Sequence, residues 1–200
     1  MKLLEIGLLI VLLCVIIALP YDIPGMTMLL VLLISLLSIL YFYSGLSISR
    51  GFRLKGVFPT ATSGTSKTDV FIGLLGGLGA SAALMGILFK VMHWPGAGME
   101  MMLGLLLSLI SLIGSLFKFR SDTSGLYKAL LKRLSVIVII GIYLMLFPLR
   151  WDMYRYQNHP SYLKALFEWR QDPQNPNLKA KFDAELMKLE KRDSLEFSHQ

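Results

Sequence analysis

The feature that most constrains this chain is a series of five long apolar runs, at residues 3–19, 26–46, 70–92, 99–117 and 134–149. A helix needs about 20 apolar residues to cross the hydrocarbon core of a bilayer. The composition agrees, because 54% of the residues are hydrophobic and only 16% are charged, against about 25% charged in a typical soluble domain. We therefore predict an all-α, polytopic helical membrane protein with about five transmembrane helices.

Two tight turns divide the first four runs into two helical hairpins, at residues 3–46 and 70–117. The first turn, residues 20–25, holds two prolines and a glycine, and the second holds His93, Trp94, Pro95 and Gly96. Pro-Gly pairs mark turns, and tryptophan suits the headgroup zone of a bilayer. With a fifth helix at residues 134–149, the transmembrane domain is expected to cover residues 1–149.

Residues 150–200 are expected to form a small helical tail outside the bilayer. Pro160 suits the first position of a helix, and Asn175-Pro176 would begin another. Apolar side chains follow helical spacing in both segments, and charged side chains lie between them. Such a pair of helices would pack on itself or present a groove to a partner.

The helices that follow the two turns resemble each other. Aligned from Met26 and Met99, they read MTMLLVLLISLLSILYF and MEMMLGLLLSLISLIGS. Leucine matches are common in membrane helices, so the shared spacing of two serines is more informative: Ser35 and Ser38, and Ser108 and Ser111. We interpret the match as a hairpin duplicated in the same orientation, a known way to build membrane folds. Convergent low complexity is the alternative.

Small residues predict where the helices approach each other closely. Helices in lipid associate through close backbone contact, which small side chains allow. The third run has a stripe at four-residue spacing, Gly73, Gly77 and Ser81. The fourth run has a stripe on one face, Gly104, Ser108, Ser111 and Ser115. We expect these two stripes to meet.

The net charge of +7 does not indicate a nucleic-acid partner, because its distribution fits a membrane protein. The tail carries nine basic and eight acidic residues, so the excess lies in two loops, residues 47–69 and 118–133. Loops rich in Lys and Arg remain on the cytoplasmic side of a membrane. We expect the N-terminus to be cytoplasmic as well, and five crossings then place the tail on the opposite side.

The charged residues near the runs all fall close to helix ends. Glu5 and Asp69 lie in first turns, where the helix dipole favours an acid, and neither is expected to be clearly buried. Lys90 and Glu100 flank the second turn. They are interpreted as interface anchors. A sharper hypothesis makes them an ion pair that fixes the hairpin, or the polar entrance to a conduction path.

No arrangement of residues predicts catalysis. The histidines, His93, His159 and His199, are too far apart in sequence to suggest a metal site. The serines of the helices have no nearby base that could activate a hydroxyl. We therefore expect no enzymatic activity, no catalytic residue, no cofactor and no metal.

One segment resembles a known family. It reads Phe89-Lys90-Val91-Met92-His93-Trp94-Pro95-Gly96-Ala97, followed by Met102-Leu103-Gly104. It is similar to the N-terminal transmembrane hairpin of the gliding-motility protein GldL family, over about thirty residues from Leu84 to Gly114. The resemblance implies a bacterial inner-membrane protein whose tight turn faces outward, in agreement with the loop charges. It also implies a membrane or periplasmic protein partner, because that family works with one in a proton-driven motor for type IX secretion and gliding.

The resemblance also implies where this chain departs from the family. The family pattern carries a proton-coupling glutamate four residues beyond the glycine matched by Gly104, and this chain has Ser108 there. A serine does not titrate at accessible pH. We therefore expect a binding or assembly component of an envelope complex, in contact with a partner or with copies of itself. The alternative is a proton- or ion-conducting or transport subunit.

Overall fold

The computed structural model describes residues 2–21, 23–50, 67–121 and 126–198, and every regular element in them is a helix. The elements are α1 (Lys2–Ala18), η1 (Leu19–Tyr21), α2 (Met26–Arg50), α3 (Lys67–Val91), α4 (Ala97–Lys118), η2 (Phe119–Ser121), α5 (Leu126–Leu146), α6 (Pro148–Arg155), α7 (Pro160–Gln171) and α8 (Pro176–Ser198). The chain is therefore all-α, as the apolar runs predict.

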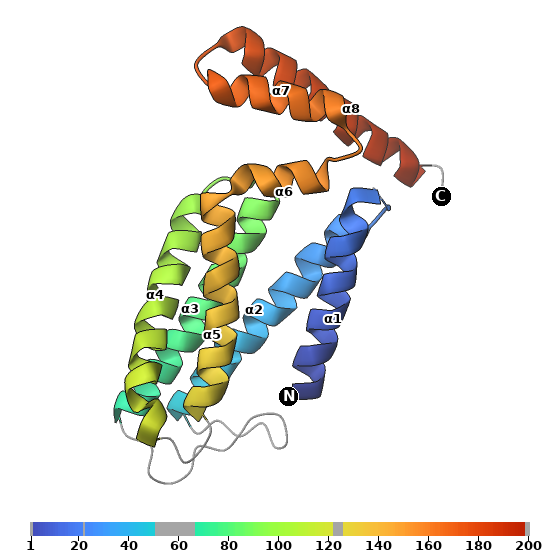
Figure 1. Cartoon of the computed structure of the whole chain (residues 1–200). Helices are drawn as coiled ribbons and strands as arrows, with labels where there is room; N and C mark the ends of the chain where they lie inside the picture. The colour runs from blue at the N-terminus through green and yellow to red at the C-terminus, as the bar shows by residue number, and fades with distance from the viewer. Residues whose placement is uncertain (1, 22, 51–66, 122–125, 199–200) are drawn as a thin grey trace. The chain divides into compact units, whose positions relative to one another are not determined.

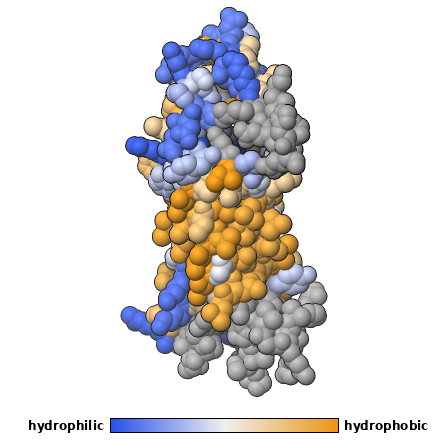
Figure 2. All heavy atoms as spheres, turned by 90° about the vertical axis from the view of Figure 1, so that its right-hand side faces the viewer, coloured by the Kyte–Doolittle hydropathy of each residue, from blue (hydrophilic) through white to orange (hydrophobic). Residues whose placement is uncertain are grey.

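Five of the helices are long and apolar enough to cross a membrane. These candidate spans are Leu3–Tyr21, Met26–Leu46, Lys67–Val91, Ala97–Lys118 and Tyr127–Leu146. The face of the spans in Figure 2 is almost continuously hydrophobic, whereas the tail helices there are largely hydrophilic. Large exposed apolar side chains occur on all five spans. Aliphatic side chains exposed in this way find a suitable solvent only in lipid, so the protein is a multi-pass membrane protein.

The fifth span differs from its prediction. It begins at Leu126 instead of residue 134, so Lys128, Lys132 and Arg133 belong to the helix and not to a basic loop. The loop expected at residues 47–69 is also shorter, because α2 continues to Arg50 and α3 begins at Lys67. Two of its expected basic residues, at positions 53 and 55, lie outside the described residues.

By their contacts, the residues group into two compact units, Met1–Leu12 with Val31–Phe147, and Leu13–Leu30 with Pro148–Gln200. In the first unit, α3, α4 and α5 run side by side (Figure 1). In the second, α7 and α8 pair with each other (Figure 1). The sequence places a boundary near residue 149, at the junction of α5 and α6, whereas residues 13–30 join the tail by contact.

Glycines let α3 approach α4 until their backbones touch. A Cβ added at Gly79 would lie 2.6 Å from the backbone N of Ser108, and one at Gly86 would lie 2.5 Å from the Cα of Met101. Gly104 faces Ala83 in the same way. Ser111 lies about two turns beyond Gly104 and donates a hydrogen bond from Oγ to the carbonyl of Ile72, at 2.8 Å. Of the predicted stripes, the one on the fourth run thus packs on α3.

The stripe on the third run faces a different helix, so the predicted meeting of the two stripes is wrong. A Cβ at Gly77 would lie 2.5 Å from the Cα of Gly45 in α2, and Gly73 borders the same contact. Ser81 lies 2.8 Å from the Oγ of Ser38, also in α2. The face that meets α4 instead carries Gly76, Gly79 and Gly86. Small residues on both faces allow α3 to pack between α2 and α4.

In the second unit, aromatic rings join α7 to α8. Trp169 stacks on Phe182 with ring centroids 4.9 Å apart, and Tyr162 lies 5.6 Å from the same ring. Lys181 donates to Glu168 at 2.5 Å on the exposed side. The expected pair of tail helices therefore exists and packs on itself. A helix that the sequence did not predict, α6, precedes it.

Candidate functional site

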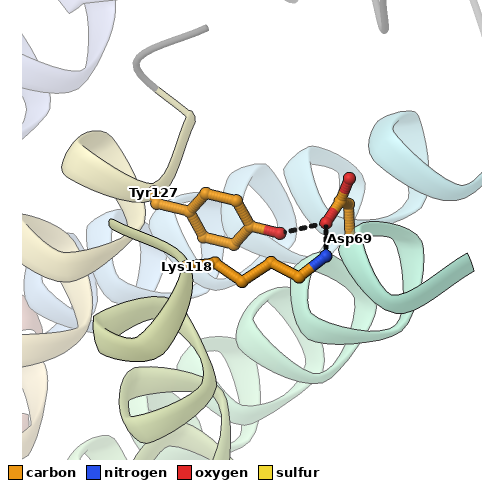
Figure 3. Close-up of polar contacts among 3 residues, drawn as sticks. All are labelled: Asp69, Lys118 and Tyr127. Atoms are coloured by element: carbon orange, nitrogen blue, oxygen red, sulfur yellow. Dashed lines mark hydrogen bonds and ion pairs between the residues drawn. The ribbon is translucent and has the colours of Figure 1, made fainter. Parts of the chain in front are cut away.

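The first polar cluster of the first unit is centred on Asp69, in the first turn of α3 (Figure 3). The Nζ of Lys118, the last residue of α4, lies 2.6 Å from its Oδ1. The hydroxyl of Tyr127, in the first turn of α5, donates to the same oxygen at 2.5 Å. The dipole of α3 also favours the negative charge there. One carboxylate thus connects the ends of three helices.

The second polar cluster is centred on Glu5, in the first turn of α1. The hydroxyl of Tyr41 in α2 donates to Oε1 at 2.9 Å. The guanidinium of Arg133 in α5 pairs with Oε2 and also lies over the Tyr41 ring, 5.6 Å from its centroid. Glu5 is only 8% exposed, so the expectation that it is not clearly buried is wrong. The burial is possible because both carboxylate oxygens have donors.

The two clusters have the same composition: a carboxylate, a cation and a tyrosine. Each acid lies in the first turn of the first helix of a hairpin, α1 or α3. Each receives one contact from the second helix of that hairpin and one from α5. The roles are exchanged, since α5 supplies a cation to Glu5 and a tyrosine to Asp69. Carboxylates held by such donors hold helices together.

The turn between α3 and α4 is built from the residues that the sequence singled out. The backbone N of Trp94 donates to the carbonyl of Phe89 at 2.8 Å, and the two rings meet edge to face. His93 and Gly96 both have positive φ, 57° and 86°. Pro95 lies between them and is exposed, and Gly96 leads directly into α4. Glycine adopts this conformation at no steric cost, which explains its place before the helix.

Lys90 and Glu100 do not form the pair that the sharper hypothesis requires. Both are half-buried, at the end of α3 and the start of α4. Within the described residues no ion pair joins them. Two other carboxylates of this unit join helices. Asp69 lies at the opposite end of the α3–α4 hairpin, and Glu5 lies in α1. Sequence spacing does not reveal them, because their partners are 36 to 128 residues away.

The second unit has a buried acid of its own. Asp152 in α6 is 1% exposed and accepts a hydrogen bond from Arg170 in α7 at 2.9 Å. Nearby, Asn158 donates to the carbonyl of Pro20 at 2.7 Å, and Tyr154 donates to that of Ile16 at 3.1 Å. Burial raises the pKa of Tyr162 well above its usual value, so its hydroxyl stays protonated. These contacts fix α6 and α7 against the turn of the first hairpin.

The described residues of the two units contain no site with the features of a metal centre. Among the described residues, no three His, Cys, Asp or Glu side chains are grouped closely enough to hold an ion. Cys14 is exposed on a candidate span and has no second cysteine to pair with. No family model, curated protein or solved structure matches this chain.

Proposed function

We propose that this chain is a non-enzymatic inner-membrane protein that serves as a binding or assembly component of a cell-envelope complex. We propose further that it is related, through the hairpin at residues 84–114, to the GldL-type proteins of gliding and type IX secretion. The observation that carries the proposal is the helical pair α7–α8, a folded polar module that follows the candidate spans.

The module has the properties of a protein-binding element. Its apolar side chains are used internally, in the stack of Trp169 on Phe182 and in the buried Tyr162 and Leu166. The exposed surface of α8 carries charged residues, Lys179 among them. A water-facing surface held in a fixed shape can recognise a partner without a large ordering cost.

Conduction is less well supported by the same structure. Ser108 occupies the position at which the resemblance expects a coupling carboxylate, and it is completely enclosed against Gly79. Glu5 and Asp69, the acids near one end of the spans, are held by cations and tyrosines. A conducting path needs groups that exchange protons or ions with water, and these are engaged in joining helices.

The proposed orientation follows from the basic residues between the spans and from the odd number of crossings. With the basic segments around residues 47–69 and 118–133 cytoplasmic, the N-terminus is cytoplasmic too. Five crossings then place α6–α8 in the periplasm. The partner is therefore a membrane or periplasmic protein, or a second copy of the chain, and the bilayer surrounds the five spans.

Site-specific photocrosslinking in native membranes tests the proposal. A crosslinking residue replaces Lys179 or Met187, both exposed on α8, and Met102, exposed on the candidate span α4, as the matched control. We expect a discrete protein adduct from the α8 positions and lipid adducts from Met102. Absence of any protein adduct from α8, together with ion flux in proteoliposomes, would instead favour the conducting alternative.

A further inference from the structure

Two exposed lysines on α5 differ from the other cations around them. Lys118 and Arg133 are held by Asp69 and Glu5. Lys128 and Lys132 are exposed, and neither pairs with a carboxylate in the part of the chain that the structure describes. They are four residues apart on one helix, so their ammonium groups lie on the same side and repel each other. An anion between them would remove that repulsion.

The lysines lie near the start of the fifth candidate span, where a membrane helix meets the lipid headgroups. The fifth candidate span begins at Tyr127, so both lysines fall within its first two turns. Lys132 lies six residues into α5, about 9 Å along the axis from its start. A lysine at that position extends its apolar stem along the helix and brings its charge to the interface, where phosphate groups are found.

The same face of α5 continues as an apolar stripe. At 100° per residue, Lys128, Lys132, Val136, Ile139 and Tyr143 fall within a sector of about 80°. Val136, Ile139 and Tyr143 are exposed. From Lys132 to Tyr143 the helix rises about 16 Å, close to half of a hydrocarbon core of about 30 Å. A cation pair followed by an apolar stripe of one leaflet's depth matches a single phospholipid.

We propose that this face of α5 binds an anionic phospholipid, with its headgroup phosphate between Lys128 and Lys132 and an acyl chain along Val136, Ile139 and Tyr143. The charge selects anionic over zwitterionic lipid, since each lysine at the interface attracts the headgroup. The site is separate from the tail module and does not depend on the proposed binding function.

Native mass spectrometry of the purified full-length protein tests the site. The protein is reconstituted in phosphatidylcholine with added phosphatidylglycerol, and the retained lipid is identified after mild activation. Wild type is expected to retain phosphatidylglycerol in preference to phosphatidylcholine. The variant Lys128→Gln/Lys132→Gln is expected to bind it about thirtyfold more weakly, about a factor of five for each lysine. The matched control Lys164→Gln/Lys179→Gln changes two exposed lysines of the tail and should bind as wild type does.

Four outcomes would overturn the proposal. Three are equal retention of the two lipids by wild type, undiminished phosphatidylglycerol binding by the α5 variant, and equal loss in the tail control. The fourth is displacement of the lipid by millimolar inorganic phosphate, because it would show a simple anion site. Equal retention of the two lipids by wild type overturns the proposal even if the α5 variant fails to fold.

Discussion

The ion pair of Glu5 and Arg133 provides the sharpest test of how the spans are held together. Removing one partner of a buried pair costs about 3–5 kcal/mol, because an uncompensated charge stays behind. Here the side chain of Glu5 is 10% exposed and that of Arg133 is 23% exposed. Water reaches the arginine, so we discount the cost and expect Arg133→Gln to destabilise the protein by about 2 kcal/mol.

The reciprocal change should cost less. In Glu5→Gln the charge left behind is that of Arg133, whose long side chain can reach the interface, and Tyr41 can still donate to the amide oxygen. We expect about 1 kcal/mol for this variant, and no more for the double variant Glu5→Gln/Arg133→Gln, because it leaves no buried charge. The sum of the two single effects then exceeds the effect of the double variant by a coupling energy of about 2 kcal/mol.

Thermal unfolding in a neutral detergent measures these differences. For a chain of this size, 1 kcal/mol corresponds to about 2–4 °C in Tm, so Arg133→Gln should melt about 4–8 °C below wild type. Lys179→Gln in the tail is the control, since this exposed lysine should change stability by less than about 0.5 kcal/mol. Strictly additive effects of the two single changes would refute a direct contact between Glu5 and Arg133.

Four further outcomes are expected. Gly77→Leu should lower Tm by overpacking against the backbone of Gly45, at a cost of at least about 1–3 kcal/mol, whereas Leu75→Ile should cost less, and equal melting temperatures would rule out this contact. In a Cys14→Ser background, cysteines at positions 63, 98 and 199 should react from the cytoplasm, the periplasm and the periplasm, and labelling of 63 and 98 from the same side would refute the orientation. The reconstituted protein alone should conduct no protons, and an uncoupler-sensitive flux abolished by Glu100→Gln would promote the conducting alternative. Hydrogen bonds from Lys181 and Lys188 lower the pKa values of Glu168 and Glu185 below 4.5 in the folded tail. The two carboxylates should therefore stabilise the folded tail above pH 4.5, and this stabilisation should be lost as the pH falls further. Thermal unfolding followed by circular dichroism at different pH values measures the loss.

The spans could be predicted because apolar length is a local property of the sequence. The start of α5 could not, since Lys128, Lys132 and Arg133 look like a basic loop. They are helical because the cost of their charges is met by contacts that local sequence does not show. Arg133 contacts Glu5, 128 residues away, and Lys128 and Lys132 are exposed. The polar clusters were missed for the same reason.

The residues that contact across helices were easier to predict than their partners. Gly77 and Ser81, like Gly104 and Ser111, stand at close contacts, because small residues permit them whichever helix is opposite. The helix α3 has two faces lined with small residues, and the partner of each residue depends on which helix packs on its face. Spacing alone does not distinguish the face with Gly77 from the face with Gly79.

The serine match between α2 and α4 acquires a geometric meaning from the turns that precede them. Gly25 and Gly96, both with positive φ and both directly before a helix, are 71 residues apart. Ser38 and Ser111 are 73 residues apart. If the hairpins are duplicates, the second has gained two residues after its turn, which rotates its serines by about 200°. Ser111 then faces α3 within its own hairpin, while Ser38 faces α3 of the next one, and both hydroxyls donate to carbonyls of that helix. In a duplicated hairpin, this shift would account for the packing of two similar helices on opposite faces of α3.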